Sequence, residues 1–155
     1  MKRISDPNVA RAFRAVPPAP RARLLALRET IFDVALRTGI GELEEALKWG
    51  EPAYLTRSKS GSTIRLGWKA KSLDEVAMYC ICTTGLVDRF RELYAHDFRS
   101  GGNRALLFDL NGRIPRKPLR HCIALALTCY RAGSAAHLFN RRTRISRRQN
   151  PGTVW

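Results

Sequence analysis

The sequence predicts an α+β domain in which helices pack on a small, largely antiparallel sheet. Segments with the apolar period of an amphipathic helix occur near both ends and in the middle of the chain, and strand-like segments separated by short polar turns lie between them. The predicted order is helix, short helix, three strands, helix, strand, helix. That order lacks the regular strand–helix alternation of a parallel, doubly wound sheet.

Four helices are expected, over residues 21–38, 42–48, 84–94 and from Pro118 to about residue 131. The first has a broad apolar arc and ends before Gly39. Its arc contains the following residues: Leu24, Leu25, Leu27, Ile31, Phe32, Val34 and Leu36. Arg28 projects into this apolar arc, and a guanidinium there needs either a carboxylate of the protein or an anionic ligand.

Strands are expected over residues 54–56, 63–68, 75–82 and 104–110. A polar turn joins the first two, which predicts a hairpin. The third is apolar on both faces, and such a strand belongs in the middle of a sheet. We therefore expect an N-terminal basic extension over residues 1–20, the α+β domain over 21–132 and an Arg-rich, mobile C-terminal tail over 133–155.

The chain has 155 residues and a net charge of +15, and residues 1–30 and 131–155 contribute +5 and +6 of it. Basic ends raise the affinity for any polyanion, so nonspecific nucleic-acid binding is one alternative function. The tail arginines that would serve it are Arg141, Arg142, Arg144, Arg147 and Arg148. Because neither a secretory signal nor an apolar run of membrane-spanning length is found, we expect a cytoplasmic protein without membrane contact.

The segment E-A-L-K-W-G-E-P-A-Y at residues 45–54 resembles the YdhG-like domain family, a family of unknown function. The resemblance continues through G-S-T-I-R-L-G-W at 61–68, F-R-E-L at 90–93 and G-N-R-A-L-L-F at 102–108. With L-R-H-C-I at 119–123, it spans about residues 21 to 131, and K-W-G-x-P is its most specific element. It implies an α+β sheet with packed helices.

Some members of that family are described as frataxin-like iron chaperones, and an acidic helix face carries iron in the frataxin mechanism. The local acid cluster of this chain is Glu42, Glu44 and Glu45, with Glu51 nearby. Carboxylate oxygens suit hard iron ions, so this cluster is the candidate metal site. The other interpretation is an exposed acidic helix start.

The K-W-G-x-P element is the first candidate for a ligand site. Trp49 beside a Gly-Pro turn could form the wall of a pocket for an anionic or planar ligand, with Lys48 next to it. Alternatively, Trp49 fills the core while Gly50 and Pro52 shape the connection.

The second candidate is a convergence of basic side chains, Arg28, Arg104 and Lys48, near Trp49 and Trp68. The alternative is that each cation reaches the surface or pairs with an acid such as Glu51 or Asp109. The complete hypothetical site is Arg28, Lys48, Trp49, Gly50, Pro52, Trp68 and Arg104.

The four cysteines, Cys80, Cys82, Cys122 and Cys129, either approach one another as a soft-metal site or act as small buried hydrophobes. The chain contains no nucleophile elbow, Gly-rich phosphate loop or H-E-x-x-H motif, so an enzyme is not expected. The sequence favours a non-catalytic binding or carrier module without a resident cofactor, whose ligand is an unidentified small or anionic molecule.

Overall fold

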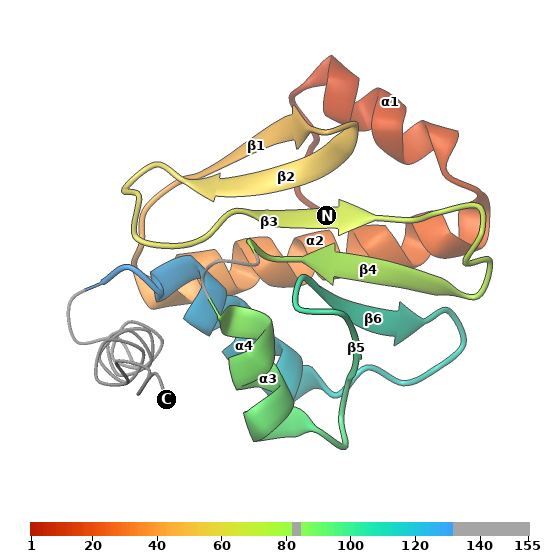
Figure 1. Cartoon of the computed structure of the whole chain (residues 1–155). Helices are drawn as coiled ribbons and strands as arrows, with labels where there is room; N and C mark the ends of the chain where they lie inside the picture. The colour runs from red at the N-terminus through yellow and green to blue at the C-terminus, as the bar shows by residue number, and fades with distance from the viewer. Residues whose placement is uncertain (82–84, 132–155) are drawn as a thin grey trace, which may run out of the picture.

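The structure is a computed structural model that describes residues 1–81 and 85–131 (Figure 1). The helices are α1 (Pro7–Ala15), α2 (Pro18–Thr38), α3 (Leu86–Tyr94) and α4 (Arg116–Thr128). The strands are β1 (Leu43–Lys48), β2 (Glu51–Thr56), β3 (Ile64–Gly67), β4 (Glu75–Tyr79), β5 (Arg99–Gly101) and β6 (Ala105–Asp109). These elements confirm the predicted α+β class.

The strands form one sheet in the order β1-β2-β3-β4-β6-β5, and every neighbouring pair is antiparallel. β4 lies between β3 and β6, as the apolar character of both its faces predicts. The register places Arg65 opposite Tyr79 and Ala77 opposite Leu107. β1 and β5 are therefore the two edge strands.

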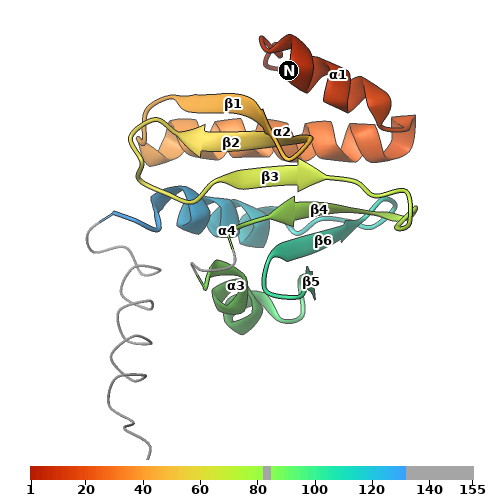
Figure 2. The ribbon, with the colours of Figure 1, turned by 45° about the horizontal axis from the view of Figure 1, so that its top comes forward.

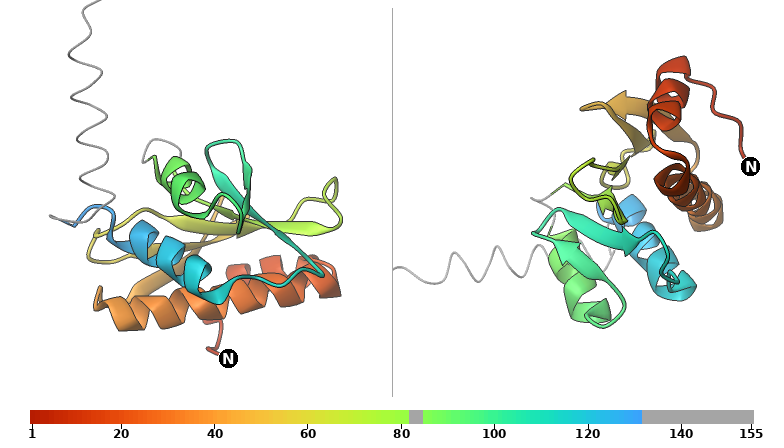
Figure 3. Two further views of the ribbon diagram at one scale, coloured as in Figure 1. Left: turned by 90° about the horizontal axis from the view of Figure 1, so that it is seen from below. Right: turned by 90° about the vertical axis from the view of Figure 1, so that its right-hand side faces the viewer.

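α2 and α4 lie side by side and cover one face of the sheet (Figures 2 and 3). α1 packs against β1 and β2 at one edge, and α3 packs against α4. The strands contribute alternate side chains to the core beneath α2 and α4: Tyr54, Ile64, Leu66, Val76, Met78, Leu106 and Phe108. α2 packs on β3 and β4, and the ion pair of Arg28 with Glu45 also ties it to the edge strand β1.

The helix predicted over residues 42–48 is wrong, because this segment is strand β1. Its residues pair with β2 from Leu43 opposite Thr56 to Lys48 opposite Glu51. Glu, Leu, Ala and Lys favour helices locally, but the antiparallel pairing with β2, which gives the backbone groups of alternate β1 residues a partner, outweighs that weak preference.

Residues 1–20 contain helix α1, which the prediction of a basic extension did not include. Asp6 caps the helix by accepting a hydrogen bond from the Asn8 N–H at 2.8 Å, and Pro7 occupies its first turn. Val9 and Phe13 are buried in the common core. This segment is thus packed as part of the domain.

The predicted tail over residues 133–155 lies outside the described residues, as does Cys82. Among the helices within residues 1–81 and 85–131, none combines the length and the apolar character needed to span a membrane.

Candidate functional site

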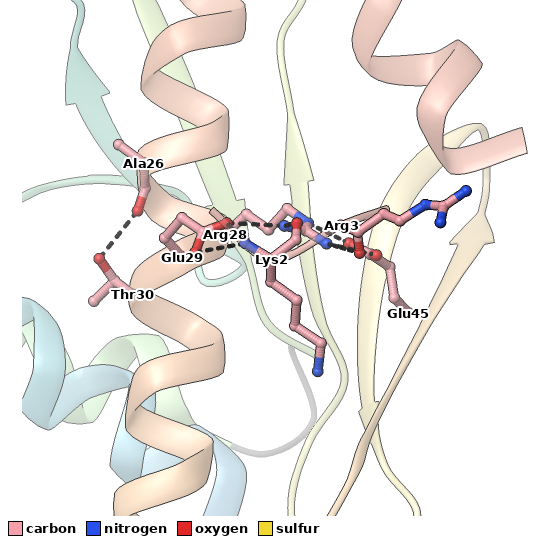
Figure 4. Close-up of polar contacts among 7 residues, drawn as sticks. All are labelled: Lys2, Arg3, Ala26, Arg28, Glu29, Thr30 and Glu45. Carbon is pink, nitrogen blue, oxygen red and sulfur yellow. Dashed lines mark hydrogen bonds and ion pairs between the residues drawn. The ribbon is translucent and has the colours of Figure 1, made fainter. Parts of the chain in front are cut away.

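A buried ion pair joins α2 to the edge strand β1 (Figure 4). Arg28 is fully buried, and its Nε and Nη2 donate to the two carboxylate oxygens of Glu45 at 2.5 and 2.9 Å. This two-pronged geometry matches the fork of a guanidinium to a carboxylate. Glu45 reaches Arg28 because it lies opposite Tyr54 on the strand face that points toward α2.

The rest of the Arg28 guanidinium holds the N-terminal segment. Nη1 donates to the Lys2 carbonyl at 2.7 Å and to Glu29 at 2.9 Å, and Nη2 also donates to the Arg3 carbonyl at 3.2 Å. Because a guanidinium has five N–H donors, every donor of Arg28 has a protein acceptor. Arg28 is therefore a structural residue, and its partner is Glu45 rather than Glu51 or Asp109.

Electrostatics keep Arg28 charged despite its burial. Burial works to lower its pKa, but the hydrogen bonds and negative charge of Glu45 outweigh that effect, and the pKa is raised. Burial also raises the pKa of the neighbouring Tyr54 phenol, and the charge of Glu45 adds to the increase. Both groups therefore keep one protonation state near neutral pH.

A groove of about 730 Å³ lies between α2 and β1, next to this ion pair. We call it the α2–β1 groove. Its helix side consists of Phe32, Ala35, Leu36 and Gly39, which recur at the spacing of a single helix face. Its other residues are Lys2, Arg3, Ser5, Asp6, residues 41–45 and Arg57. A volume of this size is typical of ligand pockets.

The exposure of Leu36 is the unexpected feature of the helix side. Its place in the apolar arc of α2 predicts burial, but 81% of its surface is exposed. Phe32, one turn earlier, is half-buried and packs edge-on against Tyr54 at 5.6 Å between ring centroids. The groove thus presents apolar surface to solvent. Sequence analysis identified both residues as apolar but could not find the groove, because it treated β1 as a helix.

Most charges in the groove are paired or otherwise engaged. Glu42 pairs with Arg57 at 3.0 Å, and Asp6 caps α1. Lys2 has no carboxylate partner for its ammonium among the described residues, and this ammonium lies 4.3 Å from the centroid of the Phe32 ring. Its side chain extends between α2 and β1 (Figure 4). Lys2 and Arg3, which also lacks a carboxylate partner among the described residues, are the cations that the groove offers to a ligand.

The K-W-G-x-P element is the turn of the β1–β2 hairpin. Trp49 and Gly50 have φ values of 56° and 76°, the left-handed pair of a type I′ turn. Trp49 is 90% exposed, so it does not fill the core. Pro52 opposes Leu47, and Lys48 is exposed beside the turn. Gly50 therefore shapes this turn, whereas Pro52 lies within β2.

The predicted convergence of basic residues near the tryptophans does not occur. Arg104 is exposed in the turn between β5 and β6, while Lys48 and Trp49 lie at the hairpin of β1 and β2. These two connections are at opposite edges of the six-stranded sheet. Trp68 packs against the core and lines a separate hollow of about 270 Å³ with Tyr79. The order of the strands in the sheet therefore separates Arg104 from Lys48 and Trp49. The sequence predicted strands but not their order in the sheet.

The three glutamates of the candidate metal site are held apart by strand geometry. Glu44 and Glu45 are consecutive residues of β1, so their side chains point to opposite faces. Arg57 pairs with Glu42, and Arg28 with Glu45. Within the described part of the chain, no group of three or more His, Cys, Asp or Glu side chains is arranged to hold a metal ion.

Three of the four cysteines lie inside the described structure, and all three are free and buried. Burial raises the pKa of Cys80 and of Cys122 to about 12. Such thiols stay protonated at neutral pH in the metal-free protein. These cysteines are packed as small hydrophobes.

Several N-terminal bases have structural partners. Arg21 donates to the carbonyls of Arg14 and Val16 at the end of α1, and Arg23 donates to those of Leu110 and Gly112. The tail residues Arg141, Arg142, Arg144, Arg147 and Arg148 lie outside the described residues.

No family model, no curated protein and no solved structure matches this chain. The resemblance to the YdhG-like family stays a prediction from the sequence.

Proposed function

We propose that this chain is a non-catalytic binding module whose ligand occupies the α2–β1 groove. The observation that supports this proposal is the exposure of Leu36 in a groove of about 730 Å³ that also contains the Lys2 ammonium, which has no carboxylate partner among the described residues. Exposed apolar surface in a concave site beside a few polar groups is typical of ligand binding. The groove carboxylates of Glu42 and Glu45 are held by arginines, which favours a holding role over proton transfer.

A fragment screen by NMR tests this proposal on the ¹⁵N-labelled full chain. We expect hits to shift the amide signals of residues 32–39 and 41–45, and Leu36→Glu to remove those shifts. The matched control is Leu73→Glu, because Leu73 is also exposed, at 66%, but is not part of the groove. Hits that map elsewhere, or that survive Leu36→Glu, contradict the proposal.

A second candidate is polyanion binding through the basic ends, which the net charge of +15 supports. Lys2, Arg3 and Arg14 have no carboxylate partner among the described residues. Affinity for single-stranded DNA should then fall steeply with salt and with deletion of residues 132–155. Binding to the groove should survive both changes. DNA affinity that is insensitive to both contradicts this second candidate.

A further inference from the structure

We infer that the occupant of the α2–β1 groove is an extended acidic peptide segment that pairs with the free edge of β1. This inference rests on the proposed function, because it names the ligand of the same groove. Peptides that add a strand to an exposed sheet edge gain affinity from main-chain hydrogen bonds and specificity from alternate side chains.

The groove follows the edge of β1 rather than one of its faces. Leu43, Glu44 and Glu45 of β1 all line it, although consecutive side chains of a strand point to opposite faces, and Gly41 and Glu42 extend the lining ahead of the strand. A cavity that contacts three consecutive strand residues reaches the edge of the strand, where the backbone lies.

Backbone groups on this edge are available for pairing. Arg57 N–H donates to the Glu42 carbonyl at 3.3 Å, so the polar backbone groups of Glu42 point toward β2. Antiparallel pairing alternates, and the N–H and C=O groups of Leu43 and Glu45 therefore point away from β2. No strand among the described residues pairs with that side of β1. A peptide strand would find both a donor and an acceptor at each of these positions.

The helix side of the groove suits alternate side chains of such a strand. Phe32 and Leu36 are one helical turn apart, about 6 Å along the axis. Side chains two residues apart on an extended peptide are separated by about 7 Å. Two apolar peptide side chains could therefore pack on Phe32 and Leu36 while the peptide backbone pairs with β1.

Charge selects the acidic character of the peptide. Glu42 and Glu45 are neutralised by Arg57 and Arg28, whereas Lys2 extends into the groove without a carboxylate partner among the described residues. Glu44 also lines the groove, but as the neighbour of Glu45 on β1 its side chain points to the face of the strand away from α2. A carboxylate on the peptide would complete this arrangement. A basic peptide would instead leave Lys2 facing a like charge.

The test begins with a phage-displayed library of random heptapeptides selected on the full chain. We expect peptides with alternating apolar residues and at least one acid. A synthetic copy is then N-methylated at one residue at a time, and its affinity is measured by fluorescence polarisation. Methylation at alternate positions should weaken binding about tenfold, the value of roughly one hydrogen bond, and the positions between them should change little.

Protein variants test the same contact from the other side. Leu43→Pro removes an outward N–H inside the groove, and Leu47→Pro removes an outward N–H of the same strand beyond it. We expect only Leu43→Pro to weaken the peptide about tenfold, with circular dichroism confirming that both variants fold. Lys2→Ala should weaken the acidic peptide but leave its amide analogue unchanged.

The experiments distinguish failure of the peptide inference from failure of the proposed binding function. No selected peptide, or an N-methyl scan without alternation, contradicts strand addition. Fragment binding that Leu36→Glu removes would leave the groove as a small-molecule site. A concentration-dependent dimer whose formation Leu43→Pro blocks would assign the edge to a second copy of the chain and would overturn the peptide assignment.

Discussion

The two edges of the sheet are built differently. β5 is three residues long, and its Arg99 pairs with Glu75 and Asp109 on the exposed surface. β1 is six residues long and is tied to α2 by the fully buried Arg28 and its partner Glu45. A very short, charged strand blunts a sheet edge against further pairing. The β1 edge is also charged, but it is twice as long, and on its outer side no strand among the described residues pairs with it.

The largest expected effect tests how firmly α1 supports the β1 edge. Phe13 is buried against this edge region, with 3% of its surface exposed. Phe13→Ala should cost about 3–5 kcal/mol of unfolding free energy, measured by urea denaturation, because it leaves a cavity in the core. Arg11→Ala, on the exposed side of α1, should cost less than about 0.5 kcal/mol. Equal, small effects would mean that residues 1–20 are an extension outside the domain.

The second-largest effect is expected when Glu45, the acceptor in the buried ion pair, is removed. Glu45→Ala should cost about 3 kcal/mol, because the fully buried Arg28 loses its main partner. The double variant Arg28→Met with Glu45→Leu should regain most of this loss, since apolar residues of similar size replace both charges. A cost below about 1 kcal/mol for Glu45→Ala would show that the pair is dispensable.

A smaller effect, of opposite sign, is expected at the hairpin turn beside this edge. Trp49 has a positive φ of 56°, which Asn adopts readily, and its side chain is exposed. Trp49→Asn should therefore stabilise the protein by about 0.5–1 kcal/mol in thermal or urea unfolding. Trp49→Val should destabilise it, because a β-branched residue disfavours positive φ. Loss of stability in Trp49→Asn would reveal a contact of the indole.

The smallest effect belongs to the β5 edge. Arg99→Ala should cost no more than about 0.5 kcal/mol, because its ion pairs are solvated. That cost should shrink further in 0.5 M salt, as screening weakens exposed pairs. The cost of Glu45→Ala should hardly change with salt. A cost at Arg99 comparable to that at Glu45 would remove the distinction between the two edges.

The sequence predicted those elements in which the spacing of apolar residues matches the face that is buried in the fold. The helical spacing of Leu24 and Leu27 predicts the apolar arc of α2. The apolar residues on both faces of residues 75–82, such as Val76 and Met78, predict the central place of β4. The signal for α1 is also present, as Asp6 and Pro7 precede Val9 and Phe13 at helical spacing. The hairpin turn at Trp49 and Gly50 was not predicted, because Trp is an unusual residue at a positive φ and residues 42–48 were expected to be a helix.

The site could not be predicted from these patterns. Residues 42–48 favour a helix locally, and as a helix they give Glu45 no defined relation to Arg28. Only the pairing with β2 brings this carboxylate to the guanidinium across seventeen residues of sequence. The groove depends on the same pairing, because its backbone edge exists only when β1 is a strand.

Amide hydrogen exchange, followed by NMR on the full chain with and without a selected peptide, tests the central claim most directly. In the free protein, we predict fast exchange for the outward amides of Leu43 and Glu45 and slow exchange for the inward amides of Glu44 and Ala46. The peptide should slow Leu43 and Glu45 at least about tenfold, as expected for amides that gain hydrogen bonds. Slow exchange of Leu43 and Glu45 before the peptide is added, or unchanged exchange in its presence, would contradict an open, peptide-binding edge.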